Sequence, residues 1–264
     1  MAKITEPQLE RNRQRMQECF LIDQKEYPAN CNIYRVFRLK YFMKMIKESR
    51  NVLTKPKLWD DPFENIVFNS TTFQVESEKH ISYSYVHERF YGQCWTLNKD
   101  ETDALWRIYS PKKDGIRVRT TIAKLFSSIY DCKKPGAFAS FFIGKVRYWE
   151  EREIRRYLRN GFLGSNILNY LWTAWTLLIK RKEFSHENEI RLLYIESRIK
   201  KAEKNNIYSY DVDINTVFDE ILFDPRFNND EYKKFRNEIE ALGFKGKIRK
   251  SRLYAVPHII ANII

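Results

Sequence analysis

The hydrophobic positions of this chain switch repeatedly between the two-residue period of a strand and the helical period of three and four. Residues 31–39 alternate apolar and polar side chains and predict a strand. Leu39, Phe42, Met43 and Ile46 then recur at helical spacing, so a helix is expected to follow this strand directly. Residues 52–68 contain two prolines and predict a short strand and an ordered loop, because each proline moves its predecessor out of the helical region.

In the rest of the chain, the spacing of hydrophobic residues also alternates between that of a strand and that of a helix. Further strands are predicted over residues 91–96, 115–120, 141–149, 187–194, 217–223 and 247–254. Further helices are predicted over residues 82–90, 122–130 and 150–159. Three more helices are predicted from their caps: one begins after Asp100 or Thr102, one begins after Ser165, and one runs from Asn229 to Gly243. The strand over 115–120 alternates apolar and basic residues, which is typical of a half-buried strand.

No internal repeat, low-complexity tract or Pro/Gly/Ser-rich linker divides the chain. We therefore expect a helical N-terminal arm over residues 1–27 and a single α+β domain over residues 28–264. The domain is predicted to have a mixed or antiparallel sheet as its core, with flanking helices.

Composition excludes several classes of protein. Four cysteines, Cys19, Cys31, Cys94 and Cys132, form no C-x-x-C pair, which excludes a zinc ribbon or thioredoxin site and favours a reduced, cytoplasmic compartment. With only 8 glycines, the chain contains neither G-x-G-x-x-G nor G-x-x-x-x-G-K-[ST], so a Rossmann or P-loop site is excluded. The first fifteen residues lack an apolar core and the most apolar run, residues 167–179, is interrupted by polar residues. We expect no signal peptide and no membrane span.

The charge balance points to an acidic partner. Lys and Arg number 47 against 34 Asp and Glu, a net charge of +13. The excess gathers in residues 11–15, 198–204 and 245–252. The residues expected to bind RNA or DNA phosphates are Lys245, Lys247, Arg249 and Lys250. A solvated basic surface explains the same clusters equally well.

Candidate chemistry centres on two places. On a strand, Glu187, Glu189 and Arg191 would share one face, where two adjacent carboxylates could stabilise a developing positive charge. The alternative is an exposed ion pair of little energetic value. Arg35 lies in an aromatic and apolar run, which suggests a partly buried guanidinium that binds a carboxylate or phosphate, or equally a structural ion pair. The four histidines form no compact ligand set, so no metal is expected.

Two aromatic features also bear on the site. Trp106 and Tyr109 are three residues apart on a predicted helix and form either core or a stacking platform. The segment from Trp59 to Glu64 combines two aromatic residues with three acids, which is typical of a turn anchored by Trp59 and Phe63.

Taken in order, these segments resemble the bacterial family known as domain of unknown function 2971, across residues 33–254. The stretches that carry the resemblance are Tyr34-Arg35, residues 60–64 (Asp-Asp-Pro-Phe-Glu), residues 94–96 (Cys-Trp-Thr), Trp106 with Tyr109, Gly115-Ile116, residues 187–191 (Glu-Asn-Glu-Ile-Arg) and residues 221–225 (Ile-Leu-Phe-Asp-Pro). The chain departs from the family at Asp60, where the family has Asn, and at Trp95-Thr96, where it has Phe-Ser. Thr96 keeps the hydroxyl, whereas Asp60 puts the role of its loop in doubt.

The same order is similar to the ADP-ribosyltransferase fold of the R-S-E class. That resemblance implies that Arg35 holds the phosphates or ribose of NAD, that Thr96 takes the place of the serine, and that Glu187 or Glu189 is catalytic, with Glu189 favoured. Tyr34, Trp106 and Tyr109 complete the set of residues expected to contact NAD. This mode of NAD binding needs no glycine-rich loop.

The expected function is therefore an NAD-dependent ADP-ribosyltransferase that modifies a macromolecular acceptor, RNA, DNA or protein. A bacterial toxin or antiphage effector, with an antitoxin or regulatory protein partner, is the role we expect. NAD is its substrate, no metal is needed, and no membrane is involved. The alternative is a non-catalytic module of a defence or stress system that binds nucleic acid or protein. A nuclease is a weaker third interpretation, because no D…E-x-K or histidine arrangement is present.

Overall fold

The computed structural model describes residues 4–59, 73–74, 80–81, 88–134, 136–161, 170–197 and 204–257. Ten strands in these residues join one sheet: β1 (Phe20–Leu21), β2 (Asn32–Arg38), β3 (Arg50–Thr54), β6 (Phe90–Thr96), β7 (Gly115–Thr121), β8 (Phe141–Lys145), β11 (Glu189–Ile195), β12 (Ile207–Asp211), β13 (Glu220–Phe223) and β14 (Lys247–Lys250). Two small sheets pair β9 (Arg147–Trp149) with β10 (Ile179–Arg181), and β4 (Phe73–Gln74) with β5 (His80–Ile81).

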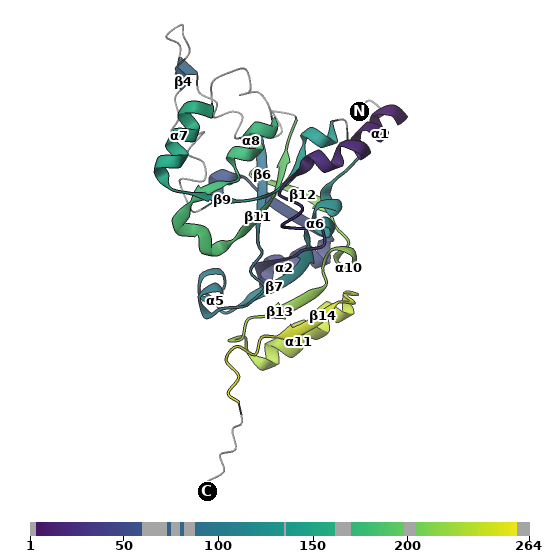
Figure 1. Ribbon diagram of the computed structural model, residues 1–264. Helices are drawn as coiled ribbons and strands as arrows, with labels where there is room; N and C mark the ends of the chain where they lie inside the picture. The colour runs from purple at the N-terminus through teal and green to yellow at the C-terminus, as the bar shows by residue number, and fades with distance from the viewer. Residues whose placement is uncertain are drawn as a thin grey trace.

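Helices flank these sheets. They are α1 (Glu6–Gln14), α2 (Leu39–Glu48), α5 (Asp103–Tyr109), α6 (Ile122–Ile129), α7 (Glu151–Gly161), α8 (Tyr170–Thr176), α10 (Ile214–Val217) and α11 (Asn229–Ala241). Short 3-10 helices occupy Arg15–Cys19, Pro56–Leu58, Ala137–Ala139 and Lys182–Glu187. Helix α11 lies with β13 and β14 at one end of the molecule, and α7 and α8 lie at the other (Figure 1).

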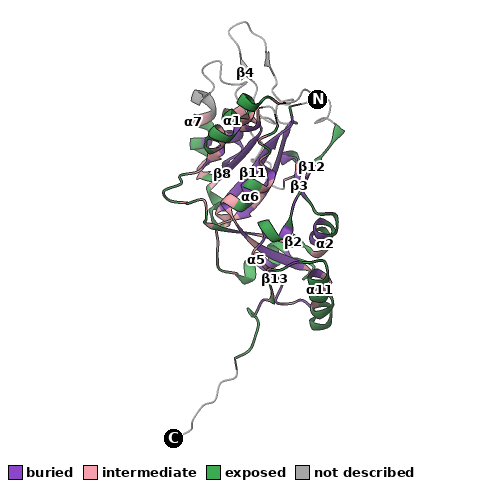
Figure 2. Cartoon of the chain, turned by 90° about the vertical axis from the view of Figure 1, so that its right-hand side faces the viewer, coloured by how far each residue is buried: buried purple, intermediate pink, exposed green. Residues whose placement is uncertain are grey.

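The large sheet runs in the order β1-β8-β11-β6-β2-β7-β13-β14, with β3 joined to β6 and to β12. Neighbouring strands of this sheet are antiparallel except at its two edges, where β1 runs parallel to β8 and β14 runs parallel to β13. This mixed sheet with flanking helices confirms the predicted α+β class. Figure 2 shows that the strands are largely buried, while the outer faces of helices such as α2 and α11 are exposed.

The sheet opens between β2 and β6. Strand β2 pairs with β7 along its whole length, and β6 pairs with β11 from Phe90 to Thr96. Between themselves, β2 and β6 pair only at Tyr34 and Thr96, because the other half of β6 faces β3 at Gly92. The backbone groups beyond that single pair are left for side chains to satisfy. This opening is where the candidate site lies.

Local sequence explains several of these elements. Helix α2 buries Phe42, Met43 and Ile46, the apolar stripe that its spacing predicts. Thr102 caps α5 by accepting a hydrogen bond from the Leu105 amide. Helix α11 is followed by Gly243, whose φ of 89° favours glycine, as predicted. Its cap is Asn228, not Asn229, because the Asn228 side chain accepts from the amides of residues 230 and 231.

Three strand predictions need correction. Residues 141–149 form two strands in different sheets, β8 and β9. Val217 ends α10, so the strand predicted from 217 begins at Glu220. Strand β7 is buried at positions on both of its faces rather than half-buried, and β2 and β13 pair with its two edges.

The strand predicted over residues 187–194 also begins later. Glu187 ends a 3-10 helix, and Asn188 has a left-handed backbone with φ of 46°, so β11 starts at Glu189. A single Asn tolerates this conformation better than most residues. Glu187 is therefore not a strand residue on the face of Glu189, yet the left-handed turn brings its carboxyl beside that of Glu189, as the site below shows.

The N-terminal segment is helical as far as Cys19 and then enters the sheet. Leu21 pairs with Gly144 in β8. The buried side chain of Asn12 donates hydrogen bonds to the carbonyl oxygens of Cys132 and Lys134, at 2.8 and 2.9 Å. These contacts attach the segment to the sheet, and the division proposed at residues 27 and 28 stays a prediction.

Some predictions lie outside the described residues. They are the loop over residues 60–68, residues 82–87 of the helix predicted over 82–90, the cap at Ser165 and the basic residues 198–201. Phe90, the last residue of that predicted helix, is the first residue of β6. Across the described part of the chain, no helix combines the length and apolar character that a membrane span needs.

Candidate active site

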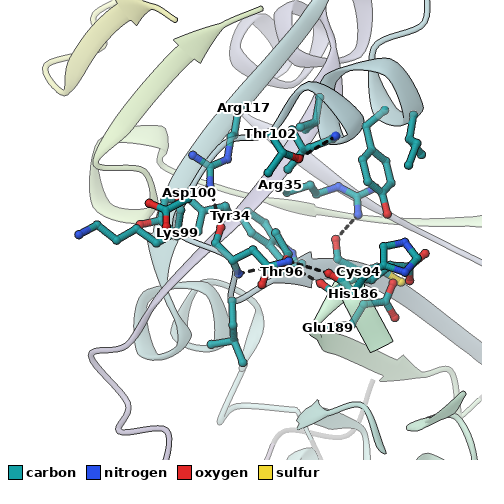
Figure 3. Close-up of a pocket in the computed structure, with 18 of the residues that line it drawn as sticks. Tyr34, Arg35, Cys94, Thr96, Lys99, Asp100, Thr102, Arg117, His186 and Glu189 are labelled. Carbon is teal, nitrogen blue, oxygen red and sulfur yellow. Dashed lines mark hydrogen bonds between the residues drawn. The ribbon is translucent and has the colours of Figure 1, made fainter. Parts of the chain in front are cut away.

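A cavity of about 580 Å³ occupies the opening between β2 and β6. Its walls come from β2, from the end of β6 and the loop after it, from α5, and from the segment that leads into β11. Six residues predicted to act on NAD line this one cavity: Tyr34, Arg35, Thr96, Tyr109, Glu187 and Glu189. Figure 3 shows how Arg35, Thr96 and Glu189 surround it.

Trp106 does not belong to this site. Its side chain is fully buried, and its indole nitrogen donates a hydrogen bond to the Glu101 carboxylate at 2.9 Å. The prediction that it contacts NAD is wrong, because the side chain is enclosed in the protein and does not line the cavity. The same helix presents Leu105, Ile108 and Tyr109 to the cavity instead.

Arg35 spans the opening between the strands. One terminal nitrogen of its guanidinium donates to the carbonyl oxygen of Cys94 on β6. Its Nε is buried and has no hydrogen-bond partner among the described residues. Burial lowers the pKa of Arg35, while charge interactions with Cys94, Glu189 and Tyr109 act in the opposite direction. A buried donor without a partner is costly, so an anion in the cavity would stabilise this arginine.

Arg117 is a second buried guanidinium that the sequence analysis missed. Its Nη2 donates to the carbonyl oxygens of Asn98 and Lys99, both at 2.7 Å, and its Nε has no partner in the part of the chain that the structure describes. The guanidinium lies 4.0 Å from the centre of the Tyr34 ring. Burial lowers the pKa of Arg117. The alternation of apolar and basic residues over 115–120 showed that Arg117 lies on the basic face of a strand. Only the place of β7 in the folded protein shows that this side chain is buried in the cavity wall.

Glu189 is held in place by cations. Its Oε2 accepts hydrogen bonds from Nε and Nη2 of Arg191, at 3.0 and 2.7 Å, and its Oε1 lies 3.7 Å from Nζ of Lys180. Glu189 is 7% exposed and Arg191 is fully buried, which excludes the alternative of an exposed ion pair. Burial alone would raise the pKa of Glu189, but Arg191 and Lys180 together hold it below its usual value.

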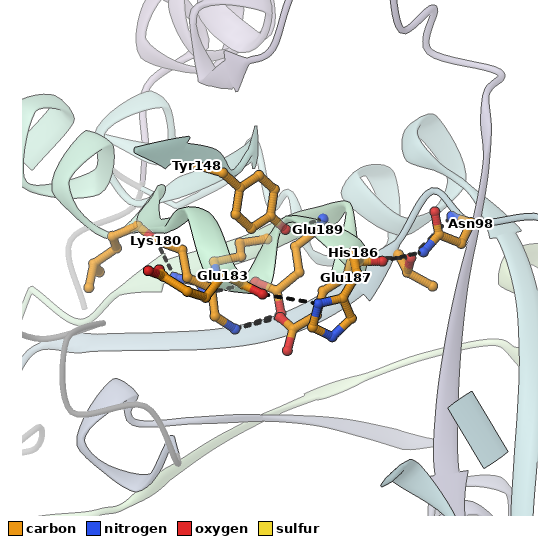
Figure 4. Close-up of polar contacts among 10 residues, drawn as sticks. Asn98, Tyr148, Lys180, Glu183, His186, Glu187 and Glu189 are labelled. Carbon is orange, nitrogen blue, oxygen red and sulfur yellow. Dashed lines mark hydrogen bonds and ion pairs between the residues drawn. The ribbon is translucent and has the colours of Figure 1, made fainter. Parts of the chain in front are cut away.

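Glu187 behaves in the opposite way. Its Oε2 forms an ion pair with Lys180, which also lies close to the Glu189 carboxylate (Figure 4). Burial raises the pKa of Glu187, Lys180 lowers it, and the adjacent charge of Glu189 raises it again, so the net shift is upward. Two neighbouring carboxyls with pKa values moved apart form an arrangement suited to acid and base roles.

The small sheet of β9 and β10 supports this pair of glutamates. Tyr148 and Lys180 are paired neighbours in the two strands. The Tyr148 hydroxyl accepts a hydrogen bond from the Glu189 amide at 2.8 Å, and Lys180 contacts both carboxylates. Neither residue was predicted, because nothing in the sequence shows that these short strands pack beside the start of β11.

Thr96 contributes through the backbone. Its hydroxyl donates to the carbonyl oxygen of Glu187 at 2.6 Å and accepts from the Asn98 amide at 3.1 Å. In the ladder, Thr96 also stands directly opposite Glu189. The single hydroxyl proton is thus used inside the protein, so Thr96 positions the segment of the glutamates.

The two tyrosines differ in their setting. Tyr34 is 7% exposed and lies against Arg117, so only part of its ring reaches the cavity. Tyr109 is 44% exposed on α5. Burial of its hydroxyl raises the pKa of Tyr109, and the charges of Glu187 and Glu189 raise it further. The charges of the two glutamates therefore act on the Tyr109 phenol, while part of this side chain is exposed to solvent.

The basic residues predicted to bind nucleic acid lie on and beside edge strand β14, outside the cavity. Lys245, Lys247 and Arg249 are exposed. Arg249 forms an ion pair with Glu220, and Lys250 donates to the side chain of Asn229 at 2.6 Å. Two of the four predicted phosphate contacts thus already have partners within the protein. In the described ranges, no three His, Cys, Asp or Glu side chains come together as metal ligands.

No family model and no curated protein matches the chain, so the resemblance to domain of unknown function 2971 stays a prediction. Among solved structures, the chain is similar to Thermus sp. 2.9 DarT in complex with NAD+, with a TM-score of 0.40 and 8% identity over 86% of this chain and 98% of that chain. It is similar to the same protein in complex with ADP-ribosylated ssDNA, with a TM-score of 0.40 and 9% identity over 86% and 96%. For the complex with carba-NAD+ the TM-score is 0.39, with 8% identity over 86% and 98%.

Proposed function

We propose that this protein is an NAD-dependent ADP-ribosyltransferase that acts on a macromolecular acceptor. The observation that carries the proposal is the composition of one cavity. It holds two guanidinium groups whose buried Nε atoms have no partner within the described ranges, and a pair of carboxyls with opposite pKa shifts. The first suits an anionic ligand, and the second suits cleavage of a glycosidic bond.

NAD fits the cavity by size and by charge. The volume of about 580 Å³ lies within the ~300–1,000 Å³ typical of ligand pockets. Arg35 and Arg117 would bind the phosphate oxygens, since guanidinium forks match them in geometry. Ile108 and Tyr109 give the ring systems of NAD an apolar and aromatic surface.

The reaction breaks the bond between nicotinamide and C1′ of its ribose. The electron pair leaves with nicotinamide, and positive charge develops on the ribose as an oxocarbenium ion. Glu189 remains ionised beside Arg191 and stabilises this charge. The acceptor atom then bonds to C1′ and loses its proton to Glu187, whose raised pKa suits a general base.

The acceptor and the biological role are parts of the same proposal. The net charge of +13 favours an acidic acceptor, a nucleic acid or an acidic protein. We also propose that the protein acts as a toxin or antiphage effector and that an antitoxin or another protein partner controls it.

Labelled NAD tests the proposal. The protein is incubated with NAD labelled in nicotinamide or in adenine, together with single-stranded DNA, RNA or total cell protein. We expect free nicotinamide and an adenine-labelled macromolecule, and loss of both with Glu189→Gln. If the wild-type protein releases no nicotinamide with any acceptor, the transferase is excluded and a non-catalytic binding module remains.

A further inference from the structure

A second hollow lies on the far side of the small sheet from the two glutamates. It has a volume of about 220 Å³ and is lined by Arg147, Trp149, Tyr157, Trp175 and Ile179. Three of these five residues are aromatic, and they come from β9, α7 and α8. The cavity at the glutamates shares none of these residues.

The alternation of side chains along β9 and β10 separates the two sites. Tyr148 and Lys180 are paired and face the glutamates, through the contacts described above. Arg147, Trp149 and Ile179 occupy the alternate positions and therefore point to the other face. One two-stranded sheet thus supports both the carboxylate pair and the aromatic hollow.

The aromatic rings of this hollow are arranged as walls. Trp149 and Tyr157 meet edge to face, with ring centres 5.2 Å apart and an angle of 67° between their planes. Also lining the hollow, the guanidinium of Arg147 lies 4.3 Å from the centre of the Trp175 ring. Arg147 is exposed, and no carboxylate of the described residues pairs with it. The hollow therefore combines aromatic surfaces with a cation that is available to a ligand.

We propose that this hollow binds one base of a single-stranded nucleic acid, with Arg147 contacting the base edge or the adjacent phosphate. Its volume is below the range typical of larger ligands, which suits one planar ring system. Aromatic side chains stack on any base, and arginine adds both charge and a planar surface. A base within a duplex is covered on both faces by its neighbours, so the strand must be single.

The inference rests on the proposed function, because it names the acceptor of that reaction. A strand anchored by one base on the outer face of β9 has its neighbouring nucleotides within reach of the edge of this thin sheet. The anchor would then hold the acceptor strand near the glutamates that lie behind Tyr148 and Lys180. The net charge of +13 supports an acidic strand as the occupant.

Binding is measured without NAD, so that turnover plays no part. Fluorescently labelled single-stranded DNA, single-stranded RNA, a DNA duplex of the same sequence and a polyglutamate peptide are titrated with Trp149→Ala, Trp149→Phe and Arg147→Gln variants. Tyr41→Ala is the matched control, because Tyr41 is an exposed aromatic residue next to Lys40 on α2, a different element. Circular dichroism and thermal melting establish which variants are folded.

We expect Trp149→Ala to weaken binding of single strands about tenfold or more, and Trp149→Phe to restore most of it. Arg147→Gln should weaken binding and reduce its dependence on salt, whereas Tyr41→Ala should bind as the wild type does. If Arg147→Gln binds single strands with wild-type affinity, as does Trp149→Ala where that variant folds, or if the duplex or the peptide binds better than single strands, the site is excluded. Release of nicotinamide is measured separately, so a protein that binds strands through Trp149 but never cleaves NAD would refute the transferase and retain this site.

Discussion

The hydroxyl of Thr96 donates a hydrogen bond to the backbone carbonyl of Glu187, at 2.6 Å, although 91 positions separate the two residues in the chain. Glu187 lies in a 3-10 helix just before a left-handed residue, so its backbone has no strand ladder to fix it. The hydroxyl supplies the missing constraint. This bond joins the end of β6 to the carboxyl pair and gives Thr96 a role without any ligand contact.

Thr96→Val should remove that constraint while keeping the size and β-branching of the side chain. We expect a loss of stability of about 1–2 kcal/mol, because the Glu187 carbonyl and the Asn98 amide both lose a partner. Release of nicotinamide should fall about tenfold through kcat more than through KM. Thr96→Ser keeps the hydroxyl and should restore both; a serine variant as impaired as the valine variant would show that the methyl group, not the hydrogen bond, matters.

Glu189→Gln should affect both catalysis and folding. Loss of the negative charge should lower nicotinamide release by ~10²-fold or more. The buried Arg191 also loses its counter-charge, so we expect a lower melting temperature, where an exposed ion pair would have left folding almost unchanged. Glu183→Gln, at an exposed position of the neighbouring 3-10 helix, is the matched control and should leave both quantities unchanged.

The pH dependence of stability provides a second measurement on the same variant. The pKa of Glu189 is lowered in the folded state, so its contribution is present above the unfolded pKa and is lost as pH falls through the folded pKa. The stability difference between wild type and Glu189→Gln should therefore be constant from about pH 7 to about pH 5 and shrink from about pH 5 to about pH 3 in urea unfolding. A difference that stays constant over this lower interval would contradict the ionised state assigned to Glu189.

Lys180→Met should move the acid limb of the activity profile to higher pH. Lys180 lowers the pKa of Glu187, so its removal should raise that pKa further and delay ionisation of the base. For stability the sign is opposite to that of Glu189: the contribution of a group with a raised pKa is lost as pH rises through that pKa. The profile of kcat/KM is measured from about pH 4 to about pH 8. Lys182→Met, an exposed neighbour paired with Glu150, should keep the wild-type profile.

Much of this fold could be predicted from the sequence, because the local signals agree with the tertiary structure. The alternation before Leu39 and the helical spacing after it define β2 and α2. The site was predictable only in part. Arg35, Thr96 and Glu189 follow from a resemblance of motifs, whereas Lys180 and Tyr148 belong to short strands whose place beside β11 depends on packing. Trp106 was misassigned because helical spacing does not tell which face of α5 meets the core.

Arg35→Lys should test the anion-binding part of the site. Lysine keeps the charge but lacks the planar fork, so it cannot both donate to the Cys94 carbonyl and bind a phosphate in the same geometry. We expect KM for NAD to rise tenfold or more with a smaller change in kcat. Arg38→Lys, at an exposed position at the end of the same strand, is the matched control. An unchanged KM in Arg35→Lys would remove Arg35 from NAD binding and leave it as a link between β2 and β6.

The basic edge of β14 is tested with Lys245→Glu and Lys247→Glu combined. Both lysines are exposed, whereas Arg249 already pairs with Glu220, and its reversal would disturb folding by placing two acids together. If this edge binds phosphates, affinity for DNA should fall regardless of sequence, and the slope of log K against log salt should decrease by about 0.9 for each duplex phosphate that the variant no longer neutralises. Lys233→Glu and Lys234→Glu on α11 change the net charge equally at another place. If the two double variants weaken binding to the same extent, the effect belongs to the overall charge of the protein and β14 is not a nucleic-acid site.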